Sequence, residues 1–390
     1  MTQARPYDLI LYGASGYTGA LVAEALAQAL AGSGRRWALA GRHLEKLERV
    51  RSQLFLPAVG DMPDLLHADS HDEPSLQALA RRCRVLVNTV GPYAELGDGL
   101  IRACIGHGCH YLDLCAEPAH VDHVRRHWHQ LALKKKTCVL PCCGFESVPA
   151  DLGVLYLLEQ VRADCGKQLA RMRLEVFAGI EAGGKLSGGS WASLLQSLAA
   201  GDWRRRHSSQ SRVYALSAHP RYVPALQRWA LPLPSIDGEV VRQSARLRAD
   251  YGGQFGYGHF VLGKRWLPLM ANAAVWAGLA AAVQVPAVRR YLQERRPRGL
   301  GPDAEERARS WFRLSLLAES GGRCWRAEVQ GGDPGYAASS HMLAQAALLL
   351  LRGEGVPGAY GVLTPATALG LALLPHLERA GIVFSRIVPV

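Results

Sequence analysis

The most informative part of the sequence is Tyr7-Asp8-Leu9-Ile10-Leu11-Tyr12-Gly13-Ala14-Ser15-Gly16-Tyr17-Thr18-Gly19. Its first six residues form a short apolar strand, and residues 16–31 carry a helical pattern, so the glycines occupy a strand-to-helix turn. There Gly13 permits the tight turn, Gly16 lets the backbone approach a pyrophosphate, and Gly19 lets helix and strand pack closely. We expect Ser15, Tyr17 and Thr18 to line the same phosphate site, at the positive end of the helix dipole.

Strand and helix patterns alternate downstream of this turn. Strands are expected over residues 37–40, 65–68, 85–90, 111–114 and 137–140. Helices are expected between them, over residues 44–53, 75–82, 99–107 and 121–133. This alternation predicts an α/β fold with a doubly wound, Rossmann-like parallel sheet, which forms a dinucleotide-binding domain over residues 1–145.

The end of the second expected strand indicates which dinucleotide binds. NAD enzymes usually carry a carboxylate there, which binds the ribose 2′-hydroxyl. This strand ends Ala40-Gly41-Arg42, without an acid, and an arginine pairs well with a 2′-phosphate. The sequence therefore favours NADP over NAD.

The other strand ends supply the remaining cofactor candidates, because ligands bind at the carboxyl edge of such sheets. Asp69 follows the third strand and is expected to accept a hydrogen bond from the adenine amine. Thr89, Val90, Gly91 and Pro92 follow the fourth strand and are expected beside the nicotinamide ribose.

The length and composition of the chain narrow the classes of protein to which it can belong. A chain of 390 residues suggests two or three domains. Its nine cysteines are odd in number and include no C-x-x-C pair, which argues against a disulfide framework and against a metal site. We expect a reduced, cytoplasmic protein without a signal peptide, because the N-terminus leads directly into a strand.

The net charge of +12 is either ordinary solvated surface or a sign of an anionic partner. Such a partner is NADP, a coenzyme A or carrier-linked thioester, or an acidic membrane surface. Nucleic acid is not expected, since no zinc-finger, RNP or helix-turn-helix signature accompanies the charge. The basic runs are residues 134–136, 204–206 and 289–298.

The pattern changes after Pro149. Strands are expected over residues 171–178, 310–317 and 324–329, and helices over 191–200, 340–351 and 365–380, with a glycine-rich turn at 183–189. Residues 204–265 give no clear pattern. We predict a second α+β domain of mixed or antiparallel sheet over residues 146–339, which binds substrate and forms a homodimer. The helices of residues 340–390 are expected to pack back on the first domain.

The run Trp266–Val288 contains no charged residue. Three structures suit it: a membrane span, a buried or dimer-interface helix, or an element adsorbed to a membrane. Pro268 and Pro286 lie near its ends and shorten any continuous helix, so we expect an apolar surface or interface element rather than a span. Basic residues flank the run: Lys264, Arg265, Arg289 and Arg290.

Several motifs carry a family resemblance. GASGYTG, AGR, NTVGPY, YLDLCAE and the segment of residues 144–153 resemble the saccharopine dehydrogenase-like oxidoreductases. Residues 183–190, 309–312, 332–336 and 361–365 resemble the trans-acting enoyl reductase branch of that family. The resemblance implies a Rossmann domain joined to a saccharopine reductase-like domain, and NADPH-dependent reduction of a lipid or polyketide double bond. The sequence departs from the family pattern at Glu146, Ser190 and Cys115-Ala116, near the expected substrate site.

Reduction of an enoyl group needs a hydride on the β-carbon, a proton on the α-carbon and a donor to the enolate oxygen. The candidate catalytic residues are Tyr93, Asp113, Ser147 and His259, with Tyr257 and Tyr336 also considered. For Ser147 the sequence favours the alternative role of capping the helix that Pro149 starts. Two alternatives stay open: reduction of a C=N bond or ketone, and an NADP-binding, membrane- or lipid-associated protein with little catalysis.

Overall fold

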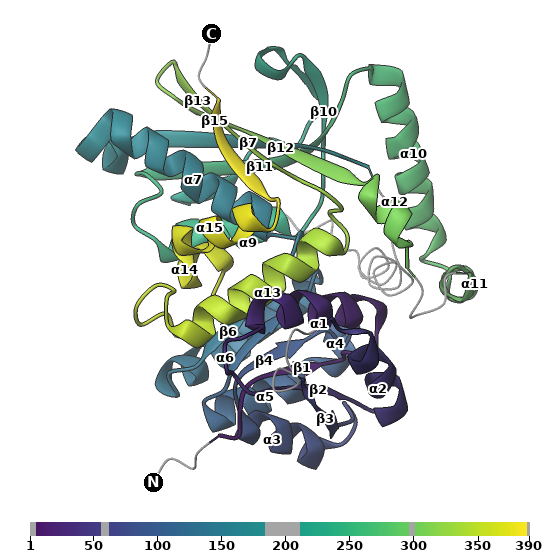
Figure 1. Cartoon of the computed structure of the whole chain (residues 1–390). Helices are drawn as coiled ribbons and strands as arrows, with labels where there is room; N and C mark the ends of the chain where they lie inside the picture. Colours follow the sequence, from purple (N-terminus) through teal and green to yellow (C-terminus); the bar gives the residue numbers. More distant parts are fainter. Residues whose placement is uncertain (1–4, 56–61, 184–210, 296–300, 388–390) are drawn as a thin grey trace.

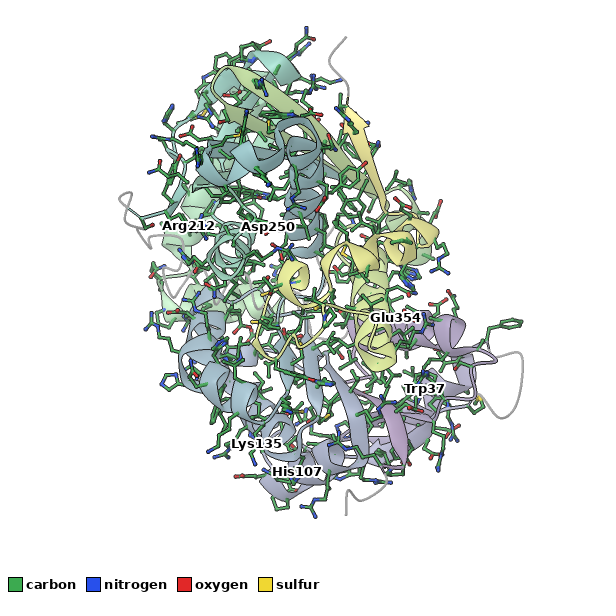
Figure 2. The ribbon with its side chains drawn as sticks, turned by 90° about the vertical axis from the view of Figure 1, so that its left-hand side faces the viewer. Trp37, His107, Lys135, Arg212, Asp250 and Glu354 are labelled. Carbon is green, nitrogen blue, oxygen red and sulfur yellow. The ribbon has the colours of Figure 1, made fainter. Side chains whose placement is uncertain are left out.

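The computed structural model describes residues 5–55, 62–183, 211–295 and 301–387, which form two sheets with helices around and between them (Figure 1). In Figure 2 the lower layer carries Trp37, His107 and Lys135, and the upper layer carries Arg212 and Asp250. Some sequence predictions fall wholly or largely outside the described residues. They are the turn at residues 183–189, the helix at 191–200, the basic run at 204–206 and the family departure at Ser190.

The lower sheet is a seven-stranded parallel sheet with the order β14-β6-β5-β4-β1-β2-β3. Its strands are β1 (Tyr7–Tyr12), β2 (Trp37–Gly41), β3 (Asp64–His67), β4 (Cys83–Asn88), β5 (His110–Asp113), β6 (Cys138–Leu140) and β14 (Gly361–Val362). Its helices are α1 (Tyr17–Leu30), α2 (Leu44–Gln53), α3 (Glu73–Arg82), α4 (Tyr93–Leu96), α5 (Asp98–His107) and α6 (Pro118–Lys134). The Rossmann-like prediction is confirmed.

The central strand β1 shows why this sheet is parallel and buried. Leu9 and Leu11 pack into one apolar cluster, and Ile10 and Tyr12 pack into another on the opposite face. A strand covered on both faces needs a continuous apolar run, as residues 9–12 provide. On one face the helix α13 (Ala337–Arg352) lies beside α1 and over β4 and β5 (Figure 1).

The upper sheet is mixed, with the order β15-β13-β12-β7-β11-β10-β9 and with β8 paired to β11. β11 pairs in parallel with β7 and β8, and the other pairs are antiparallel. Its strands are β7 (Arg173–Gly183), β8 (Val213–Ala215), β9 (Arg221–Val223), β10 (Arg228–Pro232), β11 (Gln254–Gly263), β12 (Trp311–Ser320), β13 (Arg323–Gly331) and β15 (Val383–Ile387). The predicted second α+β domain with a mixed sheet is confirmed.

Further helices join the two layers. They are α7 (Val148–Cys165), α9 (Asp237–Leu247), α14 (Pro365–Ala368) and α15 (Leu374–Arg379). The single helix expected over residues 365–380 is wrong, because the chain forms α14, a 3-10 turn and α15 there. Gly370 at φ +60° and Pro375 at the start of α15 interrupt the helical run.

The apolar run folds as α10 (Trp266–Ala282) followed by α11 (Pro286–Glu294), at the edge of the molecule beside β10 and β11 (Figure 1). Among the described residues, no single helix has both the length and the apolar composition needed to cross a bilayer. α10 and α11 meet these criteria only as a pair, and a bend of 119° separates them.

Candidate active site

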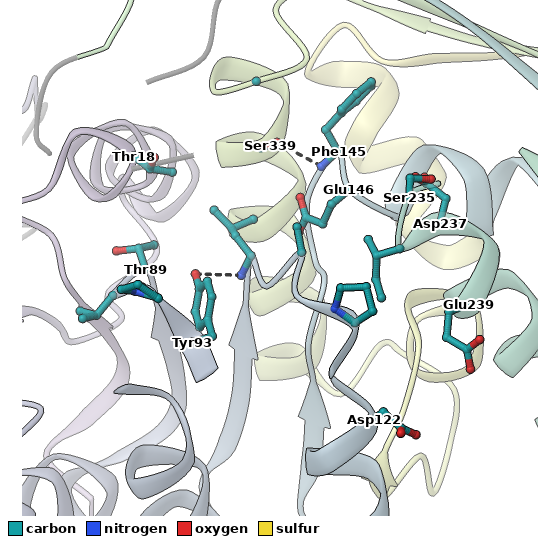
Figure 3. Close-up of a pocket in the computed structure, with 18 of the residues that line it drawn as sticks. Thr18, Thr89, Tyr93, Asp122, Phe145, Glu146, Ser235, Asp237, Glu239 and Ser339 are labelled. Carbon is teal, nitrogen blue, oxygen red and sulfur yellow. Dashed lines mark hydrogen bonds between the residues drawn. The ribbon is translucent and has the colours of Figure 1, made fainter. Parts of the chain in front are cut away.

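A cleft of about 2010 Å³ lies between the two layers. The carboxyl ends of the parallel strands form one wall, where open α/β sheets bind their ligands. α9, β10 and β11 contribute to the opposite wall. Figure 3 shows Thr89 and Tyr93 on the first wall, and Asp237 and Glu239 on the helix of the second.

The glycine-rich turn has the geometry of a dinucleotide cradle. Gly13 has φ +91°, and a Cβ there would approach Thr89 Oγ1 and Val90 Cγ2 to 2.7 Å. A Cβ on Gly19 would overlap the carbonyl of Gly13, so close packing of helix on strand requires glycine. At Gly16 the nearest atom is Gly13 O at 3.4 Å, so the surface above it is open to the cleft. These three glycines fit the turn, packing and pyrophosphate roles that the motif predicts.

The N-terminus of the helix that follows this turn suits a phosphate group. The predicted cofactor-site residues Ser15, Tyr17 and Thr18 line the cleft. Gly16 is the N-cap of α1, and the first turn of α1 contains no acidic residue. The helix N-terminus therefore offers its amides and its positive dipole end to an anion.

Beyond β2 the cleft is lined by three basic side chains: Arg42, His43 and Lys46. Arg42 is exposed directly after Gly41, the last residue of the strand. His43 and Lys46 belong to the start of α2 and were not identified from sequence, although the first helical turn after β2 lines the same cleft as Arg42. Together they suit a 2′-phosphate, which NADP has and NAD lacks.

The ends of β3 and β4 line the cleft as the sequence suggests. Asp69 and Ser70 lie there, with Ser70 Oγ 2.8 Å from the Tyr12 hydroxyl. Thr89 Oγ1 donates to Tyr12 O at 3.0 Å, and Val90 N–H donates to Asn88 Oδ1 at 2.9 Å. These bonds fix the backbone before Gly91 and Pro92, which also line the cleft. The proposed contacts to adenine and to the nicotinamide ribose remain predictions.

Tyr93 lies deep in the same wall. Its hydroxyl accepts from Leu114 N–H at 3.3 Å (Figure 3). Its own amide donates to Glu117 Oε1 at 3.0 Å. Burial raises the pKa of Tyr93 well above its usual value, so the phenol stays protonated. Glu117 also accepts from Ala94 N–H at 2.8 Å and thus holds the N-terminus of α4.

Glu146 joins this wall; from sequence it was noted only as a departure from the family pattern near the expected substrate site, and not as a catalytic candidate. Its loop follows β6, and its carboxylate accepts from Gly144 N–H at 2.8 Å. Burial raises the pKa of Glu146 to about 8, with the charge of Asp113 acting in the same direction. At neutral pH Glu146 is therefore mostly a neutral acid. Its position after a sheet strand was the available signal.

The structure places Asp113 and Ser147 inside the protein rather than in the cleft lining. Asp113 accepts from Cys115 N–H, from Cys142 N–H and from the Tyr111 hydroxyl, so it ties the end of β5 to the loop after β6. Ser147 donates to Cys142 O and is the N-cap residue of α7, without a side-chain capping bond. This geometry does not support either as a proton donor.

The opposite wall contains His259 and a group of neighbours that sequence patterns did not bring together. His259 Nδ1 lies 2.9 Å from the Tyr257 hydroxyl on β11. Asp237 lies close to His259, and burial raises its pKa. Arg242 of α9 is buried, and its Nε has no hydrogen-bond partner among the described residues. All four side chains line the cleft.

Tyr336, the remaining candidate, is fully buried and packs edge-on against Tyr17 with 5.0 Å between ring centroids. It does not line the cleft, although Pro334 and Gly335 beside it do. Its place is therefore behind the glycine-rich turn. Among the described residues, no group of three or more His, Cys, Asp or Glu side chains is arranged to hold a metal ion.

Comparison with known proteins identifies the family. The saccharopine dehydrogenase NADP-binding domain matches residues 9–139. A Mycobacterium tuberculosis protein, provisionally named a trans-acting enoyl reductase, is 33% identical over 97% of both chains. The trans-acting enoyl reductase of Mycobacterium leprae is 32% identical, also over 97% of both chains.

A solved structure supports the fold. Apo saccharopine dehydrogenase (L-Glu forming) from Saccharomyces cerevisiae superimposes with a TM-score of 0.56 over 98% of this chain and 100% of its own, at 13% identity. The chain therefore belongs to the saccharopine dehydrogenase-like family, in its trans-acting enoyl reductase branch, and is an NADP-dependent oxidoreductase.

Proposed function

We propose that the protein reduces the C=C bond of an acyl chain carried as a thioester on a lipid or polyketide-type substrate. The observation that supports this most is the division of the cleft lining. An apolar wall suits an acyl chain, and it is formed by Leu216, Leu233, Ile236 and Phe260. A basic rim suits the phosphate of a coenzyme or carrier, and it is formed by Arg125, Arg126, Arg242 and Arg246.

The rim keeps a net positive charge despite internal pairing. Arg125 pairs with Asp122 and Glu239, and Arg242 and Arg246 both pair with Glu239. Arg126 also pairs with Asp122, so among the described ion pairs of this rim four arginines share two carboxylates. Such a rim attracts an anionic substrate without neutralising itself.

When bound, NADPH supplies a hydride to the β-carbon of the enoyl group. The residues of the chain supply the proton and the positioning. His259 is our candidate for protonating the α-carbon, since it lines the cleft and Tyr257 holds its Nδ1. The protein holds the Tyr257 phenol protonated, because burial raises its pKa well above the usual value.

A second candidate function is supported by Arg242. A buried guanidinium with an unpaired Nε at a cleft wall suits a substrate carboxylate. A carboxylate-bearing imine, reduced at its C=N bond, would use this arginine directly. In that case lysine with 2-oxoglutarate, or a related pair, should consume NADPH.

A substrate panel separates the two functions. NADPH oxidation is followed with short and long 2-enoyl pantetheine thioesters, with the free enoic acids, and with lysine plus 2-oxoglutarate. We expect turnover with the thioesters and a rate that rises with chain length. Turnover with the amino acid pair alone would favour C=N reduction, and tight NADPH binding with no turnover would favour a binding protein.

The proton donor is tested by His259→Gln, which keeps a hydrogen-bonding side chain beside Tyr257. We expect kcat to fall about 10²-fold or more with little change in NADPH affinity. Glu146→Gln is the matched variant on the other wall. If it lowers kcat while His259→Gln does not, the proton comes from Glu146.

A further inference from the structure

α10 is an apolar helix that the protein itself leaves uncovered. Leu267 is 78% exposed, Val275 70% and Trp276 47%. Leu269 is the one residue of α10 that is buried. A helix that is apolar on all sides is normally enclosed by other protein, and this one is not.

The distribution of the apolar residues indicates what covers them. A protein groove covers one face of a helix and leaves a polar face toward water, which produces an amphipathic pattern. Between Trp266 and Ala282 the sequence contains no charged residue and one strongly polar side chain, Asn272. A surrounding apolar medium matches this pattern better than a groove does.

The topology excludes a crossing. β11 precedes the segment of α10 and α11 in the chain and β12 follows it, and both strands belong to the same sheet. α10 has 17 residues, about 25 Å of helix, which is shorter than the roughly 30 Å hydrocarbon core. The bend of 119° before α11 keeps the two helices from continuing as one straight span. The segment therefore enters and leaves an apolar layer from the same side.

Charge and aromatic residues agree with a membrane surface. No Asp or Glu occurs over residues 251–293. Lys264 and Arg265 precede α10, and Arg289 and Arg290 lie on α11. Three aromatic side chains of the kind enriched at membrane interfaces accompany them: Trp266, Trp276 and Tyr291.

The described chain beyond the segment contacts the glycine-rich turn. Gly301 packs against the Tyr17 ring. The Tyr17 hydroxyl donates to Pro302 O, and Arg307 donates to the Tyr17 hydroxyl at 2.8 Å and to Pro302 O at 2.9 Å. The chain that follows α11 in sequence is thereby attached to one side of the cofactor cleft.

We propose that residues 264–295 form a monotopic anchor, which inserts α10 into the acyl layer of an anionic membrane while α11 lies at its surface. This anchor holds the cleft beside the bilayer, and it does not depend on which bond the enzyme reduces. The insertion is shallow and reversible, as interfacial apolar helices flanked by basic residues are.

The test is flotation of the purified full chain with vesicles of phosphatidylcholine containing 30% phosphatidylglycerol, on the order of the anionic content that attracts basic segments. We expect the wild type to float and the variant Leu267→Ser/Val275→Ser/Trp276→Ser not to float. Phe55→Ser is the matched control, because Phe55 is 88% exposed on another part of the molecule. Retained NADPH binding shows that each variant is folded.

Charge is tested separately with Arg289→Gln/Arg290→Gln. Affinity for the anionic vesicles should fall about fivefold per arginine, with no change for pure phosphatidylcholine. Flotation of the triple variant like the wild type would overturn the proposal. So would a wild type that never floats, including one that is a dimer in solution and becomes a monomer in the triple variant.

Discussion

At Gly16, an added Cβ would meet no protein atom closer than 3.4 Å, so the chain itself does not require glycine there. The cofactor does, because a larger side chain would occupy the place of the pyrophosphate. Gly16→Val should therefore fold normally and lose NADPH binding by at least tenfold, as measured by fluorescence titration. Gly106→Val on the exposed side of α5 is the control. Unchanged affinity in a folded Gly16→Val would reduce the motif to a structural turn.

Arg42 is expected to decide between the two dinucleotides. Loss of one charge-assisted contact costs about 1.5–3 kcal/mol, so Arg42→Ala should bind NADPH about 10- to 150-fold more weakly and NADH unchanged. Isothermal titration with both dinucleotides measures this. Arg49→Ala, on the helix α2 that follows Arg42 but outside the cleft lining, should change neither affinity. Equal losses for NADPH and NADH would assign Arg42 to another contact.

The raised pKa of Glu146 predicts that the stability of the fold depends on pH. Its pKa rises from 4.5 to about 8 on folding, so between these values the folded protein keeps a proton that the unfolded chain has released. The free energy of unfolding therefore falls as pH rises toward 8. Buried histidines with lowered pKa, such as His120 at about 4, act in the opposite direction but only below about 6.5.

The window from pH 6.5 to 8 thus excludes the contribution of these histidines and contains that of the raised carboxyl groups Glu146 and Asp151. We expect chemical denaturation to show a fall of the unfolding free energy across this window. Glu146→Gln should reduce the fall by at most about 2 kcal/mol, since one pH unit corresponds to about 1.4 kcal/mol per proton. Parallel pH profiles for the two proteins would show that Glu146 is not protonated at neutral pH.

At the scale of elements, α7 is joined to α9 and α14 through one buried carboxyl group. Asp151 accepts from Ser244 Oγ and from Ala366 N–H, the latter at 2.8 Å. Asp151→Ala leaves both donors without this acceptor, so it should cost about 2–3 kcal/mol of stability. Glu159→Ala removes a half-exposed ion pair on the same helix and should cost less than about 1 kcal/mol. Denaturant unfolding compares them, and equal costs would contradict the joining role.

The helices and strands that could be predicted are those whose burial produces a recognisable pattern of apolar residues in the sequence. β1 and β2 are continuous apolar runs buried on both faces, and each is followed by a turn rich in glycine or charge. β8 and β9 have three residues each, too few for an alternation to be recognised, and they lie in the region 204–265 that gave no clear pattern.

The candidate site also has one wall that could be predicted from sequence and one that could not. The cofactor wall could be predicted because parallel strands end at one edge, so position along the chain gives position in space. The opposite wall brings Asp237 and Arg242 of α9 to Tyr257 and His259 of β11. That meeting depends on how a helix packs on a mixed sheet, and no spacing in the sequence records it.

At the scale of the molecule, the two layers contribute different chemistry to one cleft. The parallel sheet supplies the glycine turn, the basic group at the end of β2 and the neutral acid Glu146. The mixed sheet supplies the Tyr257–His259 pair and the apolar wall. A hydride from the first side and a proton from the second would add across one double bond held between them.

The most direct test is a single turnover with NADPH deuterated at C4, run with each stereoisomer and a 2-enoyl pantetheine thioester. Mass spectrometry and NMR then locate the label in the product. We predict that one of the two isomers delivers a single deuteride to the enoyl β-carbon, which gives a saturated thioester labelled once at that carbon, while solvent supplies the α-hydrogen. No saturated thioester, or deuterium found only on the carbon that began as the thioester C=O, would contradict the proposed reduction.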